Sequence, residues 1–479
     1  MAKYFNSRRD LATIVFAIVA GSIAGLIAVG AILPLMVLGT LAALYLVYLR
    51  AEIGVAALVF MTYINLSDVL MKYHGLPSIA KIYIPLLVLL LGVEWLRNGR
   101  RPWLPATGLA VLATYSLVLS LSFFYAADHK LLAAGFLQYS KDLTIALILA
   151  LLVSSPSHFR FVLWSIISGA LILGTLSVFK YLTKDLADDF GGFAQATALY
   201  WFEGQWNFRM KGSIGDANFF AQMLLIAVPI SFERMLAETT RVLKFVAGCA
   251  LLLSIVTIVL TYSRGGLVVL LMITPIALYR LRAHRKWLIT GALLVVLALP
   301  LLPAGYIDRL TAAAPAVGLE VDESQSADSS TQLRVNLMTV AWEMFLDHPL
   351  LGVGYNNYET HYQKYALVHD LNRVGGDLSA HSLYLEIAAE RGAIGLLFFG
   401  LLLFYLGKVS LHGWKAMKQA GFSSHADMIA GLAVGFLAYL LAAILLHDAY
   451  PRYFWMLAGL LLAVPGMVRN TLPRREEMA

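Results

Sequence analysis

The sequence predicts an all-α polytopic integral membrane protein with about 14 transmembrane helices. Hydrophobic residues make up 60% of the chain and charged residues only 14%, and the mean hydropathy is +0.75. A soluble domain with this composition would expose far too much apolar surface. The apolar runs also repeatedly reach the roughly 20 residues that a helix needs to cross a bilayer.

The formal net charge of +7 does not indicate a nucleic-acid partner. Lysines and arginines fall mostly in short loops between apolar runs, which is the distribution of the positive-inside bias. Cys249 is the single cysteine and lies inside an apolar run, so neither an intramolecular disulfide nor a cysteine-based metal site is expected. Asp188-Asp189 is the nearest approach to a metal-binding pair, and we interpret it as a solvated loop pair. No metal or other cofactor is therefore expected.

Residues 1–181 are predicted to form an N-terminal transmembrane bundle. The basic start could belong to a signal peptide, but the first apolar run is long, lacks a clear cleavage site and leads directly into another span. We expect this first helix to be retained, with the N-terminus in the cytoplasm. Basic residues recur after every second span, so those loops share the cytoplasmic side. Spans are predicted near 11–29, 33–49, 53–69, 80–97, 105–124, 135–153 and 159–181.

The rest of the chain alternates between polar loops and apolar runs. Residues 182–216 form a loop outside the cytoplasm, 217–303 form the central transmembrane helices, and 304–381 form a larger outer loop. Residues 382–479 supply the last transmembrane helices and a basic cytoplasmic tail. An even number of spans leaves both termini on the cytoplasmic side. The remaining spans are predicted near 217–233, 243–262, 265–281, 287–303, 383–407, 427–447 and 453–468.

The large outer loop contains one segment with helical spacing. Apolar residues recur on one face of 331–348, which predicts an amphipathic helix lying across the outer surface. Arg334 lies in its first turn. The glycine-rich stretch 348–358 that follows has no preceding strand, so it is interpreted as a turn and not as a nucleotide-binding loop.

His381 stands where this polar loop meets the apolar run 393–406. An imidazole at that depth is neutral near pH 7 and is suited to handling a proton. The alternative is that His381 only caps the helix beside Ser379 and Ser382. The other charged groups on the same side favour the chemical role.

Two arginines on the outer side are candidates for binding an anion. Arg264 stands in a short turn between two apolar runs, with glycines next to it. Arg209 and Lys211 precede the helix start at Asp216 and Asn218, and a helix N-terminus beside an arginine attracts phosphate oxygens. Interfacial snorkelling for Arg264 and a solvated basic loop for Arg209 are the alternatives. One anionic ligand bound by both arginines would explain why they share a side with His381.

Four motifs between residues 205 and 405 resemble those of the O-antigen ligase and polymerase superfamily of bacterial envelope proteins. Ala217 departs from the family, which more often has proline there, and about 14 spans exceed the 12 usual for ligases. The N-terminal half is similar only as a run of spans. The motifs are Arg209-x-x-Gly212 with Asp216-Ala217-Asn218-Phe219-Phe220-Ala221, Ser263-Arg264-Gly265, Arg334 with His348-Pro349-Leu350-Leu351-Gly352-Val353-Gly354, and His381-Ser382-x-x-Leu385-Glu386 followed by Gly392 and Gly395.

The resemblance implies a GT-C-like fold in the bacterial inner membrane, with the active site facing the periplasm. It implies metal-independent, inverting transfer of a glycan from undecaprenyl pyrophosphate to an acceptor sugar hydroxyl. Arg209 and Arg264 would hold the donor pyrophosphate, and His381 would accept or orient the hydroxyl proton. The substrate-binding residues would be Lys211, Asn218, Arg334, Tyr384 and Glu386.

The acceptor stays open at this stage. A ligase would use the lipid A-core, whereas a polymerase of O-antigen or exopolysaccharide would use the end of another carrier-linked repeat. Membrane lipids and other members of a polysaccharide assembly system are expected partners. A secondary transporter is a more distant alternative, disfavoured because the ionisable residues gather at the outer ends of spans. A structural scaffold would not need Arg209, Arg264 and His381 on one side.

Overall fold

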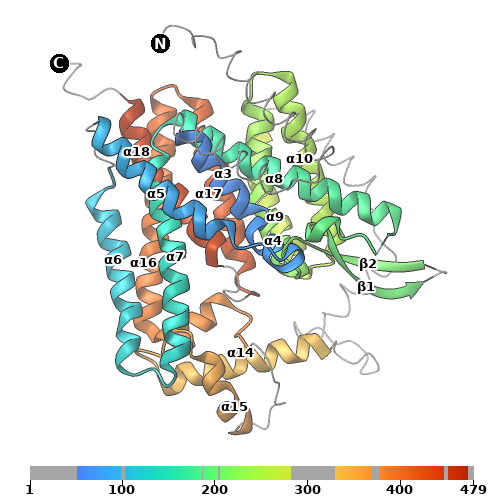
Figure 1. Ribbon diagram of the computed structural model, residues 1–479, viewed down its shortest axis with the longest axis vertical. Coiled ribbons are helices and arrows are strands. Elements are labelled where there is room, and N and C mark those ends of the chain that lie inside the picture. Colours follow the sequence, from blue (N-terminus) through green and yellow to red (C-terminus); the bar gives the residue numbers. More distant parts are fainter. Residues whose placement is uncertain are drawn as a thin grey trace.

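The computed structural model describes residues 51–98, 103–185, 187–202, 205–281, 329–368, 378–446 and 451–472. Within these residues the chain is a bundle of helices with one two-stranded hairpin (Figure 1). Nine of the described helices are long and apolar enough to cross a membrane, or up to ten if a bent pair counts as one span. The all-α polytopic membrane fold is confirmed at this level. The total of about 14 spans stays a prediction, because 11–29, 33–49 and 287–303 lie outside the described residues.

The first half of the bundle comes from the N-terminal region. The bent pair is α3 with α4, which meet at an angle of 56° where the sequence predicted one straight span. The helix α5 contains Pro85 and is apolar over its first part, Ile79–Leu89. The bounds are α3 Ala51–Tyr63, α4 Leu66–His74, α5 Ile79–Asn98, α6 Ala106–Ser120, α7 His129–Leu152 and α8 Pro156–Thr183.

The second half begins with the hairpin and ends with three long helices. Two short 3₁₀ turns, Leu121–Phe124 and Phe190–Gly192, lie in the connections of the first half. The bounds are β1 Gln195–Phe202, β2 Gln205–Gly212, α9 Ala217–Ala237, α10 Arg241–Leu260, α11 Arg264–Leu281, α14 Ser329–Asp347, α15 Tyr358–Val368, α16 Leu383–Gln419, α17 Ser423–Ala442 and α18 Pro451–Thr471.

Several spans begin at a side chain that accepts from the first backbone N–H groups. Asp128 accepts from the N–H groups of Lys130 and Leu131 at the start of α7. Ser155 does the same for α8, with Pro156 in the first turn. Asp216 accepts from Asn218 and Phe219 and so fixes where α9 begins. The cap expected at Asp216 is confirmed.

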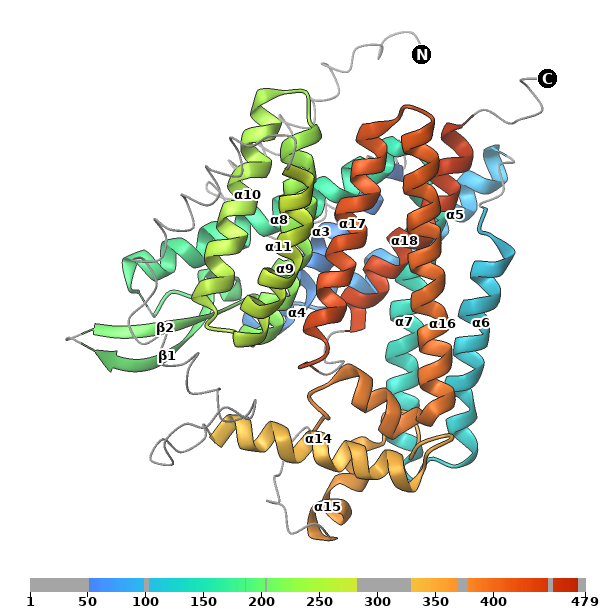
Figure 2. The same cartoon turned by 180° about the vertical axis from the view of Figure 1, so that it is seen from behind.

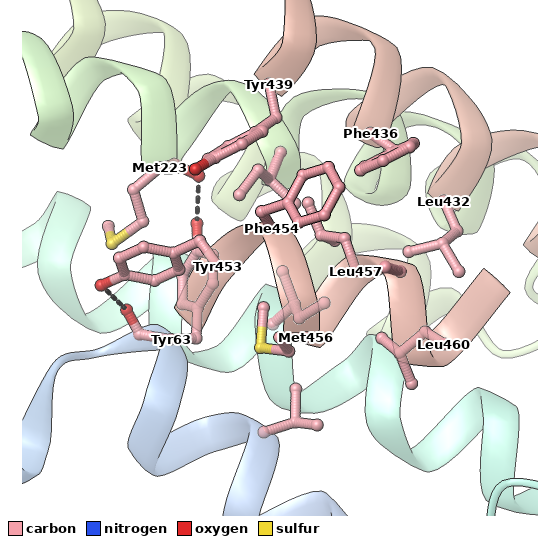
Figure 3. Close-up of a cluster of buried hydrophobic side chains, with 14 of the residues drawn as sticks. Tyr63, Met223, Leu432, Phe436, Tyr439, Tyr453, Phe454, Met456, Leu457 and Leu460 are labelled. Atoms are coloured by element: carbon pink, nitrogen blue, oxygen red, sulfur yellow. Dashed lines mark hydrogen bonds between the residues drawn. The ribbon is translucent and has the colours of Figure 1, made fainter. Parts of the chain in front are cut away.

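The core lies around α9 and α18, the most buried of the candidate spans (Figure 3). Tyr63 is fully buried and its hydroxyl donates to the carbonyl oxygen of Met223 at 3.1 Å. The hydroxyl of Tyr453 donates to the carbonyl oxygen of Tyr63 at 3.2 Å. A polar group in a bilayer must find its partner inside the protein. These two bonds therefore tie α3, α9 and α18 together within an otherwise apolar cluster.

One end of the bundle is held by ion pairs, and we call it the ionic end. There α8, α10 and α17 begin while α9 and α11 finish. Glu238 accepts from Arg160 at 2.6 Å, and Arg280 donates to both Glu233 and Asp427. The basic residues that the sequence assigned to the cytoplasmic side thus gather at one end of the described bundle.

The opposite end carries the hairpin, α14 and α15, and we call it the loop end. Figure 2 shows α14 lying across this end. The predicted helix at 331–348 is confirmed as α14, and its buried face packs on α15 and α16 through residues such as Leu337, Ala341 and Met344. No strand was predicted in 182–216, yet β1 and β2 pair antiparallel there.

The acidic pair in the same loop also differs from expectation. Asp189 is not merely solvated, because it forms an ion pair with the fully buried ammonium group of Lys180 in α8. A buried cation requires such a partner. Asp188 caps the next turn by accepting from the N–H of Phe190.

Candidate active site

Arg209 joins three segments of the loop end. It lies near the end of β2 and is half-buried. Its Nε donates to the carbonyl oxygen of Thr261 at 2.8 Å, and its Nη2 donates to Oδ1 of Asn218 at 2.8 Å. The guanidinium group is therefore held between the first turn of α9 and the turn that precedes α11. Loss of Arg209 would release both contacts.

The turn before α11 is short and tightly bonded. Thr261 Oγ1 accepts from the N–H of Ser263, and Ser263 Oγ accepts from the N–H of Gly266. Tyr262 has a φ of 50°, an uncommon left-handed conformation for a bulky residue. Arg264 follows as the first residue of α11 and is half-buried. This turn fixes Arg264 at the end of the bundle that also carries Arg209.

Gly266 shows why this turn contains glycine. A Cβ atom at Gly266 would lie 2.8 Å from Cβ of Ala221, closer than carbon atoms can approach. The first turn of α11 therefore touches α9 directly. The Arg264 segment and the Asn218 segment are neighbours for that reason.

His381 stands just before α16, in a left-handed conformation with a φ of 48°. The next helical residue, Leu383, donates its N–H to the carbonyl oxygens of Ala443 and Leu446, at 3.0 and 2.8 Å. These carbonyls end α17 and have no partner within that helix. The N-cap position of α16 belongs to Ser382. His381 is therefore not the N-cap residue of α16, and its chemical role stays a prediction.

The same turn at the end of α17 also meets α11. A Cβ atom at Gly265 would lie 3.5 Å from Cδ1 of Leu445, an ordinary van der Waals contact. The turn Ala443–Leu446 thus touches the starts of both α11 and α16. Segments carrying Arg264 and His381, far apart in sequence, are brought to one place by this shared contact.

The electrostatics around His381 point to a neutral imidazole. Burial lowers the pKa of His381 below its usual value, and the positive charge of Arg334 on α14 lowers it further. The negative charge of Asp216 acts in the opposite direction but does not reverse the shift. The charges of Arg334 on α14 and of Asp216 at the start of α9 thus both act on His381.

The loop from His348 to Gly354 holds a break in α16. Gly392 has φ 61° and ψ −163°, a backbone conformation that essentially only glycine adopts. The N–H groups of Val353 and Gly354 donate to the carbonyl oxygens of Ala389 and Glu390, both at 2.9 Å. We call this contact, together with those between 349–350 and 393–394, the α16 clamp. It sets the direction in which the short helical segment after His381 runs.

The clamp completes the geometry that the four motifs build. One motif supplies Arg209 and Asn218, the second supplies Arg264, the third supplies Arg334 and the clamp, and the fourth supplies His381. All of them lie at the loop end.

Residues 249–400 match the model of the O-antigen ligase family. The match includes Arg264, Arg334, the clamp and His381, whereas Arg209 lies before it. The family inferred from the motifs is confirmed. No curated protein matches the chain. This match covers about a third of the chain and supports the resemblance to the O-antigen ligase and polymerase superfamily.

The other predicted substrate-binding residues have different surroundings. Lys211 is half-buried just before Gly212. Tyr384 turns toward α17, where its hydroxyl donates to the carbonyl oxygen of Leu440 at 3.0 Å. Glu386 lies one turn into α16, and its charge adds to burial in raising the pKa of Tyr358 on α15. Tyr384 therefore supports the contact between α16 and α17.

Arg391 is a buried charge that the sequence analysis missed. Its side chain is 5% exposed, and Nη1 donates to the hydroxyl of Tyr115 at 2.9 Å. The ring of Tyr355 lies 4.5 Å from the guanidinium carbon, a cation–π contact. An arginine directly before a glycine inside an apolar run was the signal. Arg391 holds the clamped break of this ligase-family helix against α6.

Metal ligation has no candidate among the described residues. Within those ranges, no group of three or more histidine, cysteine, aspartate or glutamate side chains is placed to hold an ion. Metal independence itself stays a prediction for this family member.

Proposed function

We propose that this chain transfers a glycan from undecaprenyl pyrophosphate to an acceptor sugar hydroxyl at the periplasmic face of the inner membrane. The acceptor on this proposal is the lipid A-core, as in an O-antigen ligase. One observation carries the proposal: Arg209 is bound to both the α9 start and the turn before Arg264, at the end of the bundle where burial lowers the pKa of His381. The cations match the negative charge that grows on the departing pyrophosphate, and the base matches the proton that the acceptor hydroxyl releases.

This arrangement supplies the charge-neutralising groups and the base that the reaction uses. The acceptor oxygen forms a bond to the anomeric carbon while the bond from that carbon to the phosphate oxygen breaks, with inversion at the carbon. The electron pair leaves with undecaprenyl pyrophosphate, whose growing negative charge Arg209 and Arg264 neutralise. The proton of the acceptor hydroxyl passes to the imidazole of His381. The leaving group needs no general acid, because a diphosphate is already a weak base.

The neighbouring side chains have supporting roles on this proposal. Asn218 fixes one face of the Arg209 guanidinium group, and Lys211 adds positive charge along the donor path. Arg334 keeps the imidazole of His381 unprotonated. Glu386 contacts the acceptor side. Each of these roles follows the position that the residue has at the loop end.

The alternative within the same family is a polymerase. Its chemistry and its residues are the same, and its acceptor is the end of another carrier-linked repeat. On either proposal the loop end faces the periplasm, both termini lie in the cytoplasm, and the enzyme works beside other members of a polysaccharide assembly system.

Deleting the gene and resolving envelope polysaccharide on a gel tests the proposal and separates its two forms. For a ligase, we expect all long chains to disappear from the lipid A-core. For a polymerase, each core would keep one capped repeat unit. Complementation with the wild-type chain must restore the pattern, and complementation with His381→Ala must not. Unchanged polysaccharide in the deletion strain would contradict both forms.

A further inference from the structure

A cavity of about 470 Å³ lies between α3, α4, α5, α7 and the start of α18, and neither Arg209 nor Arg264 lines it. Most of its surface is apolar, but more than half of the side chains that line it are polar, although the helices around it are candidate or broken membrane spans. Polar and ionisable groups inside a membrane bundle are costly and mark a ligand site or pathway by default. The volume is within the range of roughly 300–1,000 Å³ that ligand pockets have.

The deepest polar group of this cavity is a carboxylate. Asp142 lies midway along α7 and is 2% exposed. Nε2 of Gln138, one turn earlier, donates to Oδ2 of Asp142 at 2.9 Å. Their pairing presents an amide and a carboxylate side by side on one wall of the cavity.

The lining also includes an arginine that is paired with a carboxylate. Nη2 of Arg452 lies 2.9 Å from Oδ2 of Asp68, and Nη1 donates to Oδ1 of Asn65 at 3.2 Å. Because each deep charge lies near one of opposite sign, the cavity offers donors and acceptors without a strong excess of either charge. Such a lining fits hydroxyl groups better than a phosphate or a metal ion. Lys81 and Lys141 are exposed and lie in the rim.

Asn65 connects this cavity to the arginine site. It stands at the break between α3 and α4 with a φ of 58°. Besides accepting from Arg452, its Nδ2 donates to the carbonyl oxygen of Ser213 at 3.1 Å. Ser213 belongs to the loop that runs from Arg209 to the cap at Asp216. One side chain thus contacts both the cavity and the loop between Arg209 and Asp216. Broken helices that line cavities are typical of membrane substrate sites.

We propose that this cavity is a glycan subsite, which binds sugar residues of the donor or acceptor near the reacting bond. The inference rests on the proposed function. The amide and carboxylate groups would hydrogen-bond to hydroxyls, and apolar lining residues such as Met61, Ile84 and Ile145 would contact the C–H faces of sugar rings. Asn65 connects the subsite to the loop that leads from Arg209 to the start of α9.

Ala80→Phe, which fills the cavity, is the main test. Ala113→Phe, at an exposed position on α6, is the matched control. The full chain is purified in detergent, and the probe is the lipid-free oligosaccharide released by mild acid from the host's carrier-linked glycan. Titration calorimetry should show binding weakened about tenfold or more by Ala80→Phe and unchanged by Ala113→Phe, since several hydrogen bonds are lost. Gln138→Leu, which keeps the size, should weaken binding in the same direction.

Transfer assays identify which glycan the subsite holds. Ala80→Phe should raise KM for the donor if the subsite holds donor sugars, and KM for the acceptor if it holds acceptor sugars, with kcat little changed. His381→Ala should still bind the oligosaccharide while transferring none. Wild-type binding without any transfer would sink the proposed function but keep the subsite. Unaltered oligosaccharide binding and KM values in both Ala80→Phe and Gln138→Leu, or no binding by the wild type, would overturn the subsite.

Discussion

His381 combines a strained backbone with a depressed pKa. A left-handed conformation costs a residue with a Cβ atom roughly 1–3 kcal/mol and persists where the surroundings enforce it. Here the bonds from Leu383 to the end of α17 enforce it. Such strain, together with an imidazole kept neutral by burial and by Arg334, is the combination expected of a general base.

Replacing His381 with alanine should reduce the rate of glycan transfer by about 10²–10⁴-fold, the usual contribution of a general base. Purified protein and a fluorescent lipid-linked glycan would provide the measurement. His425→Ala is the matched control, because His425 is also partly buried but stacks on Phe422 at the ionic end. Equal losses in both variants would contradict the assignment.

The pH dependence of transfer should report the charge of Arg334. Since Arg334 lowers the pKa of His381, Arg334→Gln should raise it, so protonation would switch the base off at a higher pH. The acid limb of the kcat/KM profile should therefore move to higher pH. Arg334→Lys keeps the charge and should leave the limb near its wild-type position. A limb that moves to lower pH in Arg334→Gln would exclude this role.

Arg264 should contribute to transfer because it lies at the loop end, and not because it is the first residue of a helix. Arg264→Gln should reduce transfer by about 10²-fold or more, as loss of one charge-stabilising donor does. Arg241→Gln is the comparison, since Arg241 begins α10 at the ionic end and is exposed. Transfer assays on both purified variants would decide it. The idea fails if Arg241→Gln reduces transfer as much.

At the scale of elements, the α16 clamp sets the direction of the helical segment that carries the fourth motif. A Cβ atom at Gly392 would lie 2.3 Å from the carbonyl carbon of Leu350, and one at Gly352 would lie 2.3 Å from that of Glu390. Two glycines, one on each side, therefore permit two backbones to touch. The motif from His348 to Gly354 holds the break in α16. It affects transfer only by positioning the helical segment that follows His381.

Gly392→Ala should destabilise the protein by at least roughly 1–3 kcal/mol, the cost of the backbone conformation alone. The contact with Leu350 adds to this cost. Thermal unfolding in detergent would show a lower midpoint, and transfer should fall along with it. Gly400→Ala is the control on the same helix, because a Cβ there meets nothing within 4 Å. Equal midpoints for the two variants would argue against the clamp.

At the scale of the whole molecule, the ionic end and the loop end define an orientation. The sequence places the first in the cytoplasm and the second in the periplasm. The natural chain has one cysteine, so Cys249→Ser gives a cysteine-free background. Cysteines can then be introduced at exposed positions, Glu359 on α15 and Ser423 at the start of α17.

An impermeant maleimide should label Glu359→Cys from the periplasm of whole cells. It should label Ser423→Cys only after the inner membrane is broken, because the two positions lie at opposite ends of the bundle. Labelling in intact and lysed cells, followed by a gel shift, would measure both. The reverse pattern would place the candidate active site in the cytoplasm and contradict the proposed donor.

The sequence by itself determined the class of fold and the approximate span positions from 105 to 281 and from 383 to 468, and it singled out Arg209, Arg264 and His381 as candidate site residues. Hydropathy and charge are local properties of the sequence. Because a bilayer selects for both, spans and their orientation can be predicted along the chain. The hairpin, the bend at Asn65, the break at Gly392 and the buried Asp142 with its polar cavity were decided only by the tertiary structure. Each depends on a partner distant in sequence: Ser213 for Asn65, Leu350 for Gly392, and neighbouring helices for the cavity. No local pattern records such a contact, because its free energy exists only once the helices have packed.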